Sequence, residues 1–265
     1  MSSASSGPII LIGAGNMGGA MLSGWLKSGV AGSSIVVIDP GPSEQMMKTI
    51  NDAGVTHVTS APAGLTAGVL FLAVKPQVMD AVLPPVKGTV GSETVVVSVA
   101  AGKTLLFLEK HLGEAAMVRA MPNTPAMVGR GVTGAFANAR VTDAQREHVH
   151  SLLLVSGPVE WVPTEADIDA VTALSGSGPA YVFYLVECMA EAGRKLGLQA
   201  DLAMRLARET VAGAGELLHQ SPDDASRLRQ NAFITSRTAS IWRLPGGRVH
   251  SGESRWGSPK TRLLE

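Results

Sequence analysis

Three glycines near the amino terminus stand at a spacing that suits the binding of phosphate groups. Gly13, Gly15 and Gly18 follow the apolar run 8–12 and open a stretch with helical spacing. Gly13 permits a tight turn, Gly15 lets the backbone approach a pyrophosphate, and Gly18 lets the helix pack closely on the strand. The pyrophosphate would meet N–H groups at the positive end of that helix. The pattern predicts a dinucleotide-binding turn.

An acidic residue follows at the distance that dinucleotide-binding folds use. Asp39 ends the next apolar run, 35–38, and stands 21 residues after Gly18. A carboxylate at this point can accept hydrogen bonds from both hydroxyls of the adenine ribose, and it would repel a 2′-phosphate. Asp39 taken alone therefore favours NAD over NADP. The alternative interpretation is a glycine turn with an unrelated surface aspartate.

Small residues follow two further apolar runs, where the strands of such a fold would end. Residues 73–76 read Ala-Val-Lys-Pro, and residues 100–102 read Ala-Ala-Gly. Open α/β sheets bind ligands at the carboxyl ends of their strands, and small side chains leave room there for a flat ring. Lys75 also fits an ordinary solvated lysine. Asn123 offers a carboxamide from a rigid loop with two prolines.

The sequence shows neither the spacing of metal ligands nor the surroundings of a reactive thiol. The six histidines have no suitable carboxylate or cysteine neighbours, and His148 and His150 point to different faces of an expected helix. Cys188, the one cysteine, lies in an apolar run and is expected to be a buried filler. We expect no metal site.

The elements that must position these residues alternate between strand and helix up to about residue 162. The strands are almost wholly apolar, as expected when helices cover both faces of a parallel sheet. Residues 1–162 are therefore predicted to form a doubly wound Rossmann domain. The alternating runs are 8–12, 17–28, 35–38, 44–53, 69–74, 78–83, 94–99, 105–112, 142–155 and 158–162.

Beyond Pro163 the strand pattern stops, and a second, all-α domain is predicted over residues 163–265. Residues 167–174, 180–196 and 201–219 have the alanine, leucine and methionine content of helices. Asp201 is expected to cap the last of these helices. The fold class is therefore α/β followed by all-α.

The charge balance and the amino terminus bear on partners and compartment. Lys plus Arg (22) equals Asp plus Glu (22), so no global field draws the chain to nucleic acid or to anionic lipid. The start of the chain lacks a secretory signal, and the apolar runs are shorter than the roughly 20 residues of a membrane helix. With a single cysteine, these features predict a soluble, cytoplasmic protein.

Five motifs in a fixed order closely resemble pyrroline-5-carboxylate reductase, over residues 8 to 231. They are the glycine turn, residues 71–76, residues 100–102, the Met-Pro-Asn-Thr-Pro of 121–125, and residues 169–181. The last motif is the most specific. Its Ser-Gly-Ser-Gly-Pro leads into an apolar helix, and these residues would weaken a helix that served only as core.

The resemblance implies the reduction of 1-pyrroline-5-carboxylate to L-proline, the last step of proline biosynthesis, with NADPH or NADH. It places Glu165, Ser177 and Thr238 near the substrate. It implies a helical domain that associates as a dimer or a higher oligomer and completes the active site between subunits. The implied cofactor-binding residues are Ile12, Gly13, Ala14, Gly15, Asn16, Met17, Gly18, Asp39, Ala73, Val74, Lys75, Pro76, Val99, Ala100, Ala101, Asn123 and Asn231.

The expected chemistry needs little from side chains, because the cofactor supplies the hydride. A ring imine accepts a hydride best when its nitrogen is protonated, and no residue stands out as a general acid. We hypothesise that the substrate arrives protonated from solvent. Ser177→Ala would then raise KM for the imine and leave the cofactor affinity unchanged; an unchanged KM would remove Ser177 from the site.

The end of the chain departs from the family. After Asn231 the family continues with Thr-Ser-Pro-Gly-Gly-Thr-Thr and an alanine-rich helical tail, whereas residues 235–238 here read Thr-Ser-Arg-Thr. The tail 237–265 is therefore atypical, and residues 242–265 have no helical periodicity. We hypothesise a frameshift near residues 237–241, which would impair substrate binding and dimerisation. Sequencing the DNA tests this, because a neighbouring frame must then encode an alanine-rich helix.

Two alternative functions stay open at this point. A β-hydroxyacid dehydrogenase shares the glycine turn and a helical second domain, but it needs a lysine soon after the glycine-rich helix start. Here the helix after Gly178 reaches none before Lys195. The other alternative is a non-catalytic or impaired dinucleotide-binding protein, which the atypical tail favours.

Overall fold

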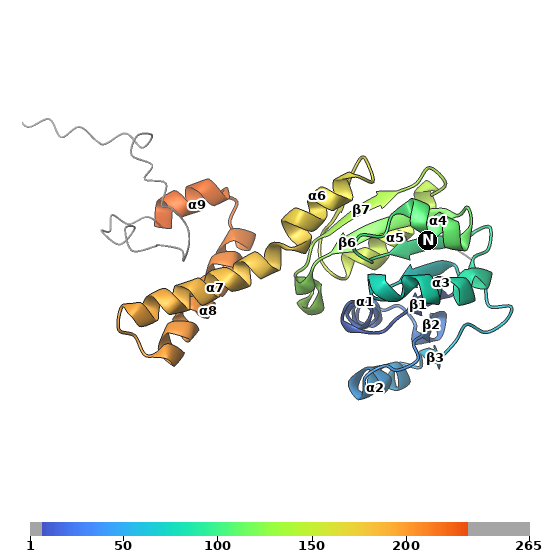
Figure 1. Ribbon diagram of the computed structural model, residues 1–265, viewed down its shortest axis with the longest axis horizontal. Coiled ribbons are helices and arrows are strands. Elements are labelled where there is room, and N and C mark those ends of the chain that lie inside the picture. The colour runs from blue at the N-terminus through green and yellow to red at the C-terminus, as the bar shows by residue number, and fades with distance from the viewer. Residues whose placement is uncertain (1–6, 233–265) are drawn as a thin grey trace, which may run out of the picture. The chain divides into compact units, whose positions relative to one another are not determined.

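Apolar strands at the centre of a parallel sheet dominate the first part of the chain. The computed structural model describes residues 7–232, and within them the sheet has eight strands in the order β3-β2-β1-β4-β5-β6-β7-β8 (Figure 1). The strands are β1 (Ile9–Ile12), β2 (Ile35–Ile38), β3 (Thr56–Val58), β4 (Val69–Leu72), β5 (Val95–Ser98), β6 (Ala116–Pro122), β7 (Thr133–Ala137) and β8 (Val159–Trp161).

Alternate residues of each central strand enter two separate cores. Ile9 and Leu11 of β1 pack in one core with Trp25, whereas Ile10 and Ile12 pack in the other. Since side chains alternate between the faces of a strand, an uninterrupted apolar run is what a sheet buried on both faces requires. The predicted Rossmann architecture is therefore confirmed.

Helices cover both faces of this sheet. Buried residues of α1 and α5 belong to the first core, and those of α3 and α4 belong to the second. Short 3-10 turns connect several of these elements. The helices and turns of this part are α1 (Asn16–Lys27), η1 (Gly32–Ser34), α2 (Glu44–Asp52), η2 (Pro76–Val78), α3 (Met79–Val86), η3 (Lys87–Thr89), α4 (Leu105–Leu112), η4 (Thr124–Val128) and α5 (Asp143–Leu154).

Three strands were not expected from the sequence. β3, β6 and β7 are short or carry polar, proline and glycine residues, so they lack the uninterrupted apolar run of the central strands. The sheet is also not wholly parallel, because β7 runs antiparallel to β6 while β8 is parallel to β7. The expected strand at 158–162 is β8, which pairs at this edge of the sheet.

A short helix and a π-helical turn pack on the last strands. α6 (Asp167–Val171) passes directly into η5 (Thr172–Gly176), so the single helix expected over 167–174 is divided in two. A Cβ on Gly134 of β7 would lie 2.6 Å from Val171 Cγ1. This tight packing keeps α6 and η5 in the first compact unit, Met1–Ala180, which extends past the boundary expected at residue 162.

The second compact unit begins at Tyr181 and is helical in its described part. It contains α7 (Gly178–Lys195) from Tyr181 onward, α8 (Ala200–Gln220) and α9 (Ala225–Ala232). Ala190 of α7 and Ala203 of α8 are both buried, and a Cβ on Gly193 would lie 3.1 Å from Ala203 Cβ. Small side chains thus allow α7 and α8 to pack closely.

The expected cap of α8 is wrong by two residues. The N-cap position is Gln199, whose side chain makes no capping hydrogen bond, and Asp201 lies in the first turn. There its carboxylate still interacts favourably with the positive end of the helix. Among residues 7–232, no helix combines the length and the apolar character needed to cross a bilayer.

Candidate functional site

The glycine turn has the geometry that its sequence predicts. Gly13 has a φ of +88°, in the left-handed region, and its N–H donates to the carbonyl of Ile38 at 3.0 Å. A Cβ on Gly18 would lie 1.9 Å from the carbonyl oxygen of Gly13, so only glycine fits there. A Cβ on Gly15 would meet nothing within 4 Å. The turn is closed on one side and open on the side from which a ligand would approach.

Asp39 lies against this turn. One carboxylate oxygen accepts from the backbone N–H of Ala14 at 2.7 Å, and the other accepts from Gly41 at 2.8 Å. A ring nitrogen of His57 lies 2.9 Å from the backbone carbonyl of Asp39. Each carboxylate oxygen has a further lone pair, so the side chain can still accept a hydrogen bond from a ribose hydroxyl.

A surface cavity of about 660 Å³ adjoins the turn and Asp39. It is lined by Ala14, Gly15 and Asn16, and it continues along α1 as far as Lys27, between Met46 and residues 126–129. The residues expected at the nicotinamide are not among those that line it. The cavity therefore corresponds to the phosphate and adenosine half of the predicted site.

The nicotinamide-side residues meet at the carboxyl edge of the sheet. The N–H of Ala73 donates to Ile12 at 2.9 Å, and the N–H of Val99 donates to Leu72 at 3.1 Å, which continues the pairing of β1, β4 and β5. Ile12 is buried and Lys75 is exposed. The sheet thus brings residues 12–18, 73–76 and 99–101 to one edge from three segments of the chain.

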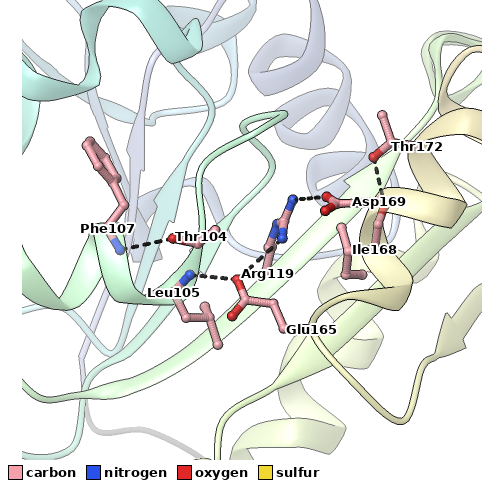
Figure 2. A network of polar contacts seen from close by, with 8 residues as sticks. All are labelled: Thr104, Leu105, Phe107, Arg119, Glu165, Ile168, Asp169 and Thr172. Carbon is pink, nitrogen blue, oxygen red and sulfur yellow. Dashed lines mark hydrogen bonds and ion pairs between the residues drawn. The ribbon is translucent and has the colours of Figure 1, made fainter.

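Next to this edge lies a network of charged groups that centres on Arg119 of β6 (Figure 2). Arg119 is 3% exposed; its Nη1 lies 3.3 Å from Glu165 Oε1 and its Nη2 lies 2.8 Å from Asp169 Oδ1. Glu165 Oε1 also accepts from the backbone N–H of Leu105 at 2.7 Å. Because Leu105 begins α4, Glu165 is anchored three residues beyond Gly102.

Sequence comparisons identify relatives of both parts of the chain. Residues 165–238 match the profile described as pyrroline-5-carboxylate reductase dimerisation, and residues 8–102 match that described as NADP oxidoreductase, coenzyme F420-dependent. The pyrroline-5-carboxylate reductase of Pseudomonas aeruginosa is 42% identical over 232 residues, which cover 87% of this chain and 85% of the relative. The chain belongs to the pyrroline-5-carboxylate reductase family.

Solved structures of the pyrroline-5-carboxylate reductase family agree with this assignment. The enzyme from Coxiella burnetii superposes with a TM-score of 0.80 and 34% identity, covering 90% of this chain and 88% of its own. The enzyme from Plasmodium falciparum, solved with NADP bound, has a TM-score of 0.71 and 25% identity, covering 88% of this chain and 86% of its own.

In this member of the family, Asn123 is engaged inside the protein. Its Nδ2 donates to the carbonyl of Ser175 at 3.1 Å, and its Oδ1 accepts from the N–H of Val132 at 3.0 Å. The carboxamide therefore ties η5 to the loop after β6. Asn123 thus positions η5, and its expected contact with the cofactor stays a prediction.

The hydroxyl groups around η5 donate back to the main chain. Ser177 Oγ donates to the carbonyl of Thr172 at 3.0 Å, and Ser175 Oγ donates to Val171 at 3.1 Å. Each hydroxyl can still accept a hydrogen bond, but its proton is already used. The role of Ser177 at the substrate stays a prediction.

The remaining predicted site residues lie in the second compact unit or outside residues 7–232. Asn231 is on α9, whereas Thr238 and the atypical tail 237–265 lie outside the described residues. Within residues 7–232 there is no group of three His, Cys, Asp or Glu residues that could hold a metal ion.

Sequence reasoning missed Arg119, Asp169 and the π-helical turn. A signal for Arg119 was present, because a charged residue inside an otherwise apolar strand needs a partner. Asp169 stands four residues after Glu165, a spacing that places both on one side of a helical segment. π-helical turns occur often at functional sites, and the Ser-Gly-Ser-Gly motif overlaps this one at Ser175 and Gly176.

Proposed function

We propose that this chain reduces the ring imine of 1-pyrroline-5-carboxylate to L-proline with NADH or NADPH, and so completes proline biosynthesis. The observation that carries the proposal is that the dinucleotide turn and the predicted substrate residue Glu165 meet at one edge of the sheet. The dinucleotide turn and residues 99–101 lie at this edge, and Glu165 is anchored on the first residue of α4, which follows residues 99–101. Family membership supports the same reaction.

The glycine turn and Asp39 fit the proposed cofactor. Gly15 leaves open space for a pyrophosphate, and the N-cap of α1 has no side-chain hydrogen bond that would compete for the first N–H groups. We propose that Asp39 binds the adenine ribose and favours NADH. Bound NADH or NADPH supplies the hydride.

The proposed role of Glu165 is to stabilise the substrate. A protonated ring nitrogen carries a positive charge until the hydride arrives at the neighbouring carbon, and a fixed carboxylate lowers the energy of that cation. The Glu165 side chain is 28% exposed, so a ligand can reach it. Ser177 and Thr238 are proposed to bind the substrate carboxylate, and Asn231 is proposed to contact the cofactor.

We further propose a division of labour between residues 1–162, which bind the dinucleotide, and residues 163–265, which bind substrate and associate with a second copy. The exposed apolar side chains of α7 and α8 support self-association; they include Phe183 (60% exposed), Tyr184 (56%) and Leu217 (58%). The single cysteine supports a cytoplasmic location.

A three-part assay tests the reductase against its alternatives. Absorbance of the reduced nicotinamide is followed with pyrroline-5-carboxylate, the reverse reaction is followed with 3-hydroxy acids and the oxidised cofactor, and cofactor alone is titrated by fluorescence. We expect turnover with the imine only. Turnover with a 3-hydroxy acid would indicate a β-hydroxyacid dehydrogenase, and cofactor binding without turnover would indicate a non-catalytic protein.

A further inference from the structure

Arg119 is a buried cation whose position the strand alone does not explain. Its neighbours in β6, Val118 and Ala120, are buried and apolar, as expected for a strand inside the sheet. A guanidinium removed from water is unfavourable unless it is paired and hydrogen-bonded. Arg119 has these partners in Glu165 and Asp169, which both come from a segment far along the chain.

The two nitrogens of the guanidinium bind different carboxylates. Nη1 contacts Glu165, and Nη2 contacts Asp169 (Figure 2). Asp169 is 75% exposed and is well solvated without Arg119, whereas Glu165 is 28% exposed. If Arg119 is removed, water can replace it at the exposed Asp169 more readily than at Glu165. The position of the Glu165 carboxylate therefore depends more on the arginine than that of Asp169 does.

The contacts of Glu165 leave one oxygen for a ligand. Oε1 accepts from both Arg119 Nη1 and the N–H of Leu105, at 3.3 Å and 2.7 Å. Among the described residues, no hydrogen bond or ion pair reaches Oε2. Two donors on one oxygen restrict the rotation of the carboxylate, so the second oxygen keeps a defined direction.

We propose that Arg119 is a positioning residue for imine reduction, which holds Glu165 so that Oε2 can accept the N–H of the protonated substrate. This inference rests on the proposed function. Arg119 itself does not touch the substrate; it acts through Glu165. Asp169 is the second anchor of the guanidinium and orients it in the plane that Glu165 requires.

The pairing requires an arginine. A planar guanidinium presents separate N–H groups to two carboxylates at once, whereas a lysine ammonium is a single point on a flexible chain. Arg119→Lys therefore keeps the buried positive charge but cannot span Glu165 and Asp169 together. Arg119→Met would leave two carboxylates without their cation and can prevent folding, so the lysine variant decides the test.

The test compares wild type, Arg119→Lys, Glu165→Gln and the double variant in steady-state assays with pyrroline-5-carboxylate. We expect KM for the imine to rise about tenfold in Arg119→Lys, as the loss of one charge-assisted hydrogen bond implies, with a smaller change in kcat. The Kd for NADPH, measured by fluorescence, is expected to stay within about twofold. Arg140→Lys, which makes the same change in an exposed arginine paired with Glu114, is the matched control, with a change in KM below about threefold.

The double variant separates positioning from general structural damage. If Arg119 acts only through Glu165, the loss of kcat/KM in the double variant equals that in Glu165→Gln alone. Additive losses, an unchanged KM in Arg119→Lys, or an equal loss of cofactor affinity would each overturn the inference. If the wild type turns over the imine and Arg119→Lys has an unchanged KM, only this inference is overturned. If the wild type shows no turnover, the proposed function is overturned as well.

Discussion

The carboxylate of Asp39 holds the glycine turn, and we propose that it also selects the cofactor. It accepts N–H groups from Ala14 and Gly41. If it also faces the adenine ribose, as we propose, its negative charge disfavours a 2′-phosphate at the same place. In this proposal a single side chain links the shape of the glycine turn to the choice of cofactor.

Replacing Asp39 by Ser is expected to shift the cofactor preference towards NADPH. The serine removes the repulsion of the 2′-phosphate, so the ratio of kcat/KM for NADH to that for NADPH should fall at least about tenfold. Steady-state kinetics with both cofactors measure this ratio. Asp52→Asn, an exposed aspartate at the end of α2, is the control. An unchanged ratio in Asp39→Ser would show that Asp39 does not face the ribose.

Gly15 and Gly18 should respond to alanine in opposite ways. A Cβ on Gly18 would overlap the carbonyl of Gly13, so Gly18→Ala is expected to lower the free energy of unfolding by about 2 kcal/mol or more. A Cβ on Gly15 meets open space, so Gly15→Ala should keep its stability and lose cofactor affinity. Urea unfolding and fluorescence titration measure the two effects. A Gly15→Ala variant with wild-type affinity contradicts the assigned pyrophosphate position.

The sequence predicts the local parts of the site better than the distant ones. The glycine turn and Asp39 could be identified from the sequence because each glycine is required for a steric reason within one turn of the chain. Arg119 meets Glu165 across 46 residues, and Asn123 meets Ser175 across 52. These pairs depend on how β6 and the residues after it pack against η5 and the segment before α6, which the residue pattern does not encode.

Among the elements, α5 carries a group that links stability to pH. Burial lowers the pKa of His148 from its ordinary value of 6.5, so the folded protein protonates this imidazole less readily than the unfolded chain does. His148 lines a small cavity with Trp25 and Ser151. As pH falls below 6.5 the unfolded chain binds a proton that the folded chain does not, and the folded state loses stability.

His148→Gln is therefore expected to flatten the decline of stability between about pH 7.5 and about pH 5.5. Urea unfolding at the two pH values measures this decline in the wild type and in the variant. His219→Gln, which alters an exposed histidine of α8, should leave the decline as it is. A decline that is the same in His148→Gln and in the wild type would show that His148 is not its source.

Strands were predicted correctly where the run of apolar residues is uninterrupted. β1, β2, β4 and β5 are fully buried runs of four, and the expected positions of these strands are confirmed within two residues at either end. β6 and β7 were missed because Arg119, Pro122 and Gly134 interrupt the pattern. Two of the three have a tertiary reason, since Arg119 pairs with Glu165 and Gly134 makes room for Val171.

At the scale of the whole molecule, self-association is expected to depend on α7. Phe183→Asp places a charge among exposed apolar side chains and should weaken the association at least about tenfold, because the charge would be buried in the interface. Analytical ultracentrifugation over a range of concentrations measures it. The control is Glu147→Gln, on the exposed surface of α5 in the first compact unit.

Cofactor affinity provides the second measurement for Phe183→Asp. The dinucleotide turn lies in the first compact unit, so the Kd for NADH should not change. A monomeric wild type, or a Phe183→Asp variant that associates normally, would contradict a self-association surface on α7.

The most direct test of the account follows the hydride itself. The chain is incubated with pyrroline-5-carboxylate and NADH that carries two deuterium atoms at C4 of the nicotinamide, and the proline formed is analysed by mass spectrometry and NMR. We expect L-proline with one deuterium on the ring carbon next to nitrogen that was the imine carbon. Bound NADH that transfers no deuterium to proline would contradict the proposed hydride transfer.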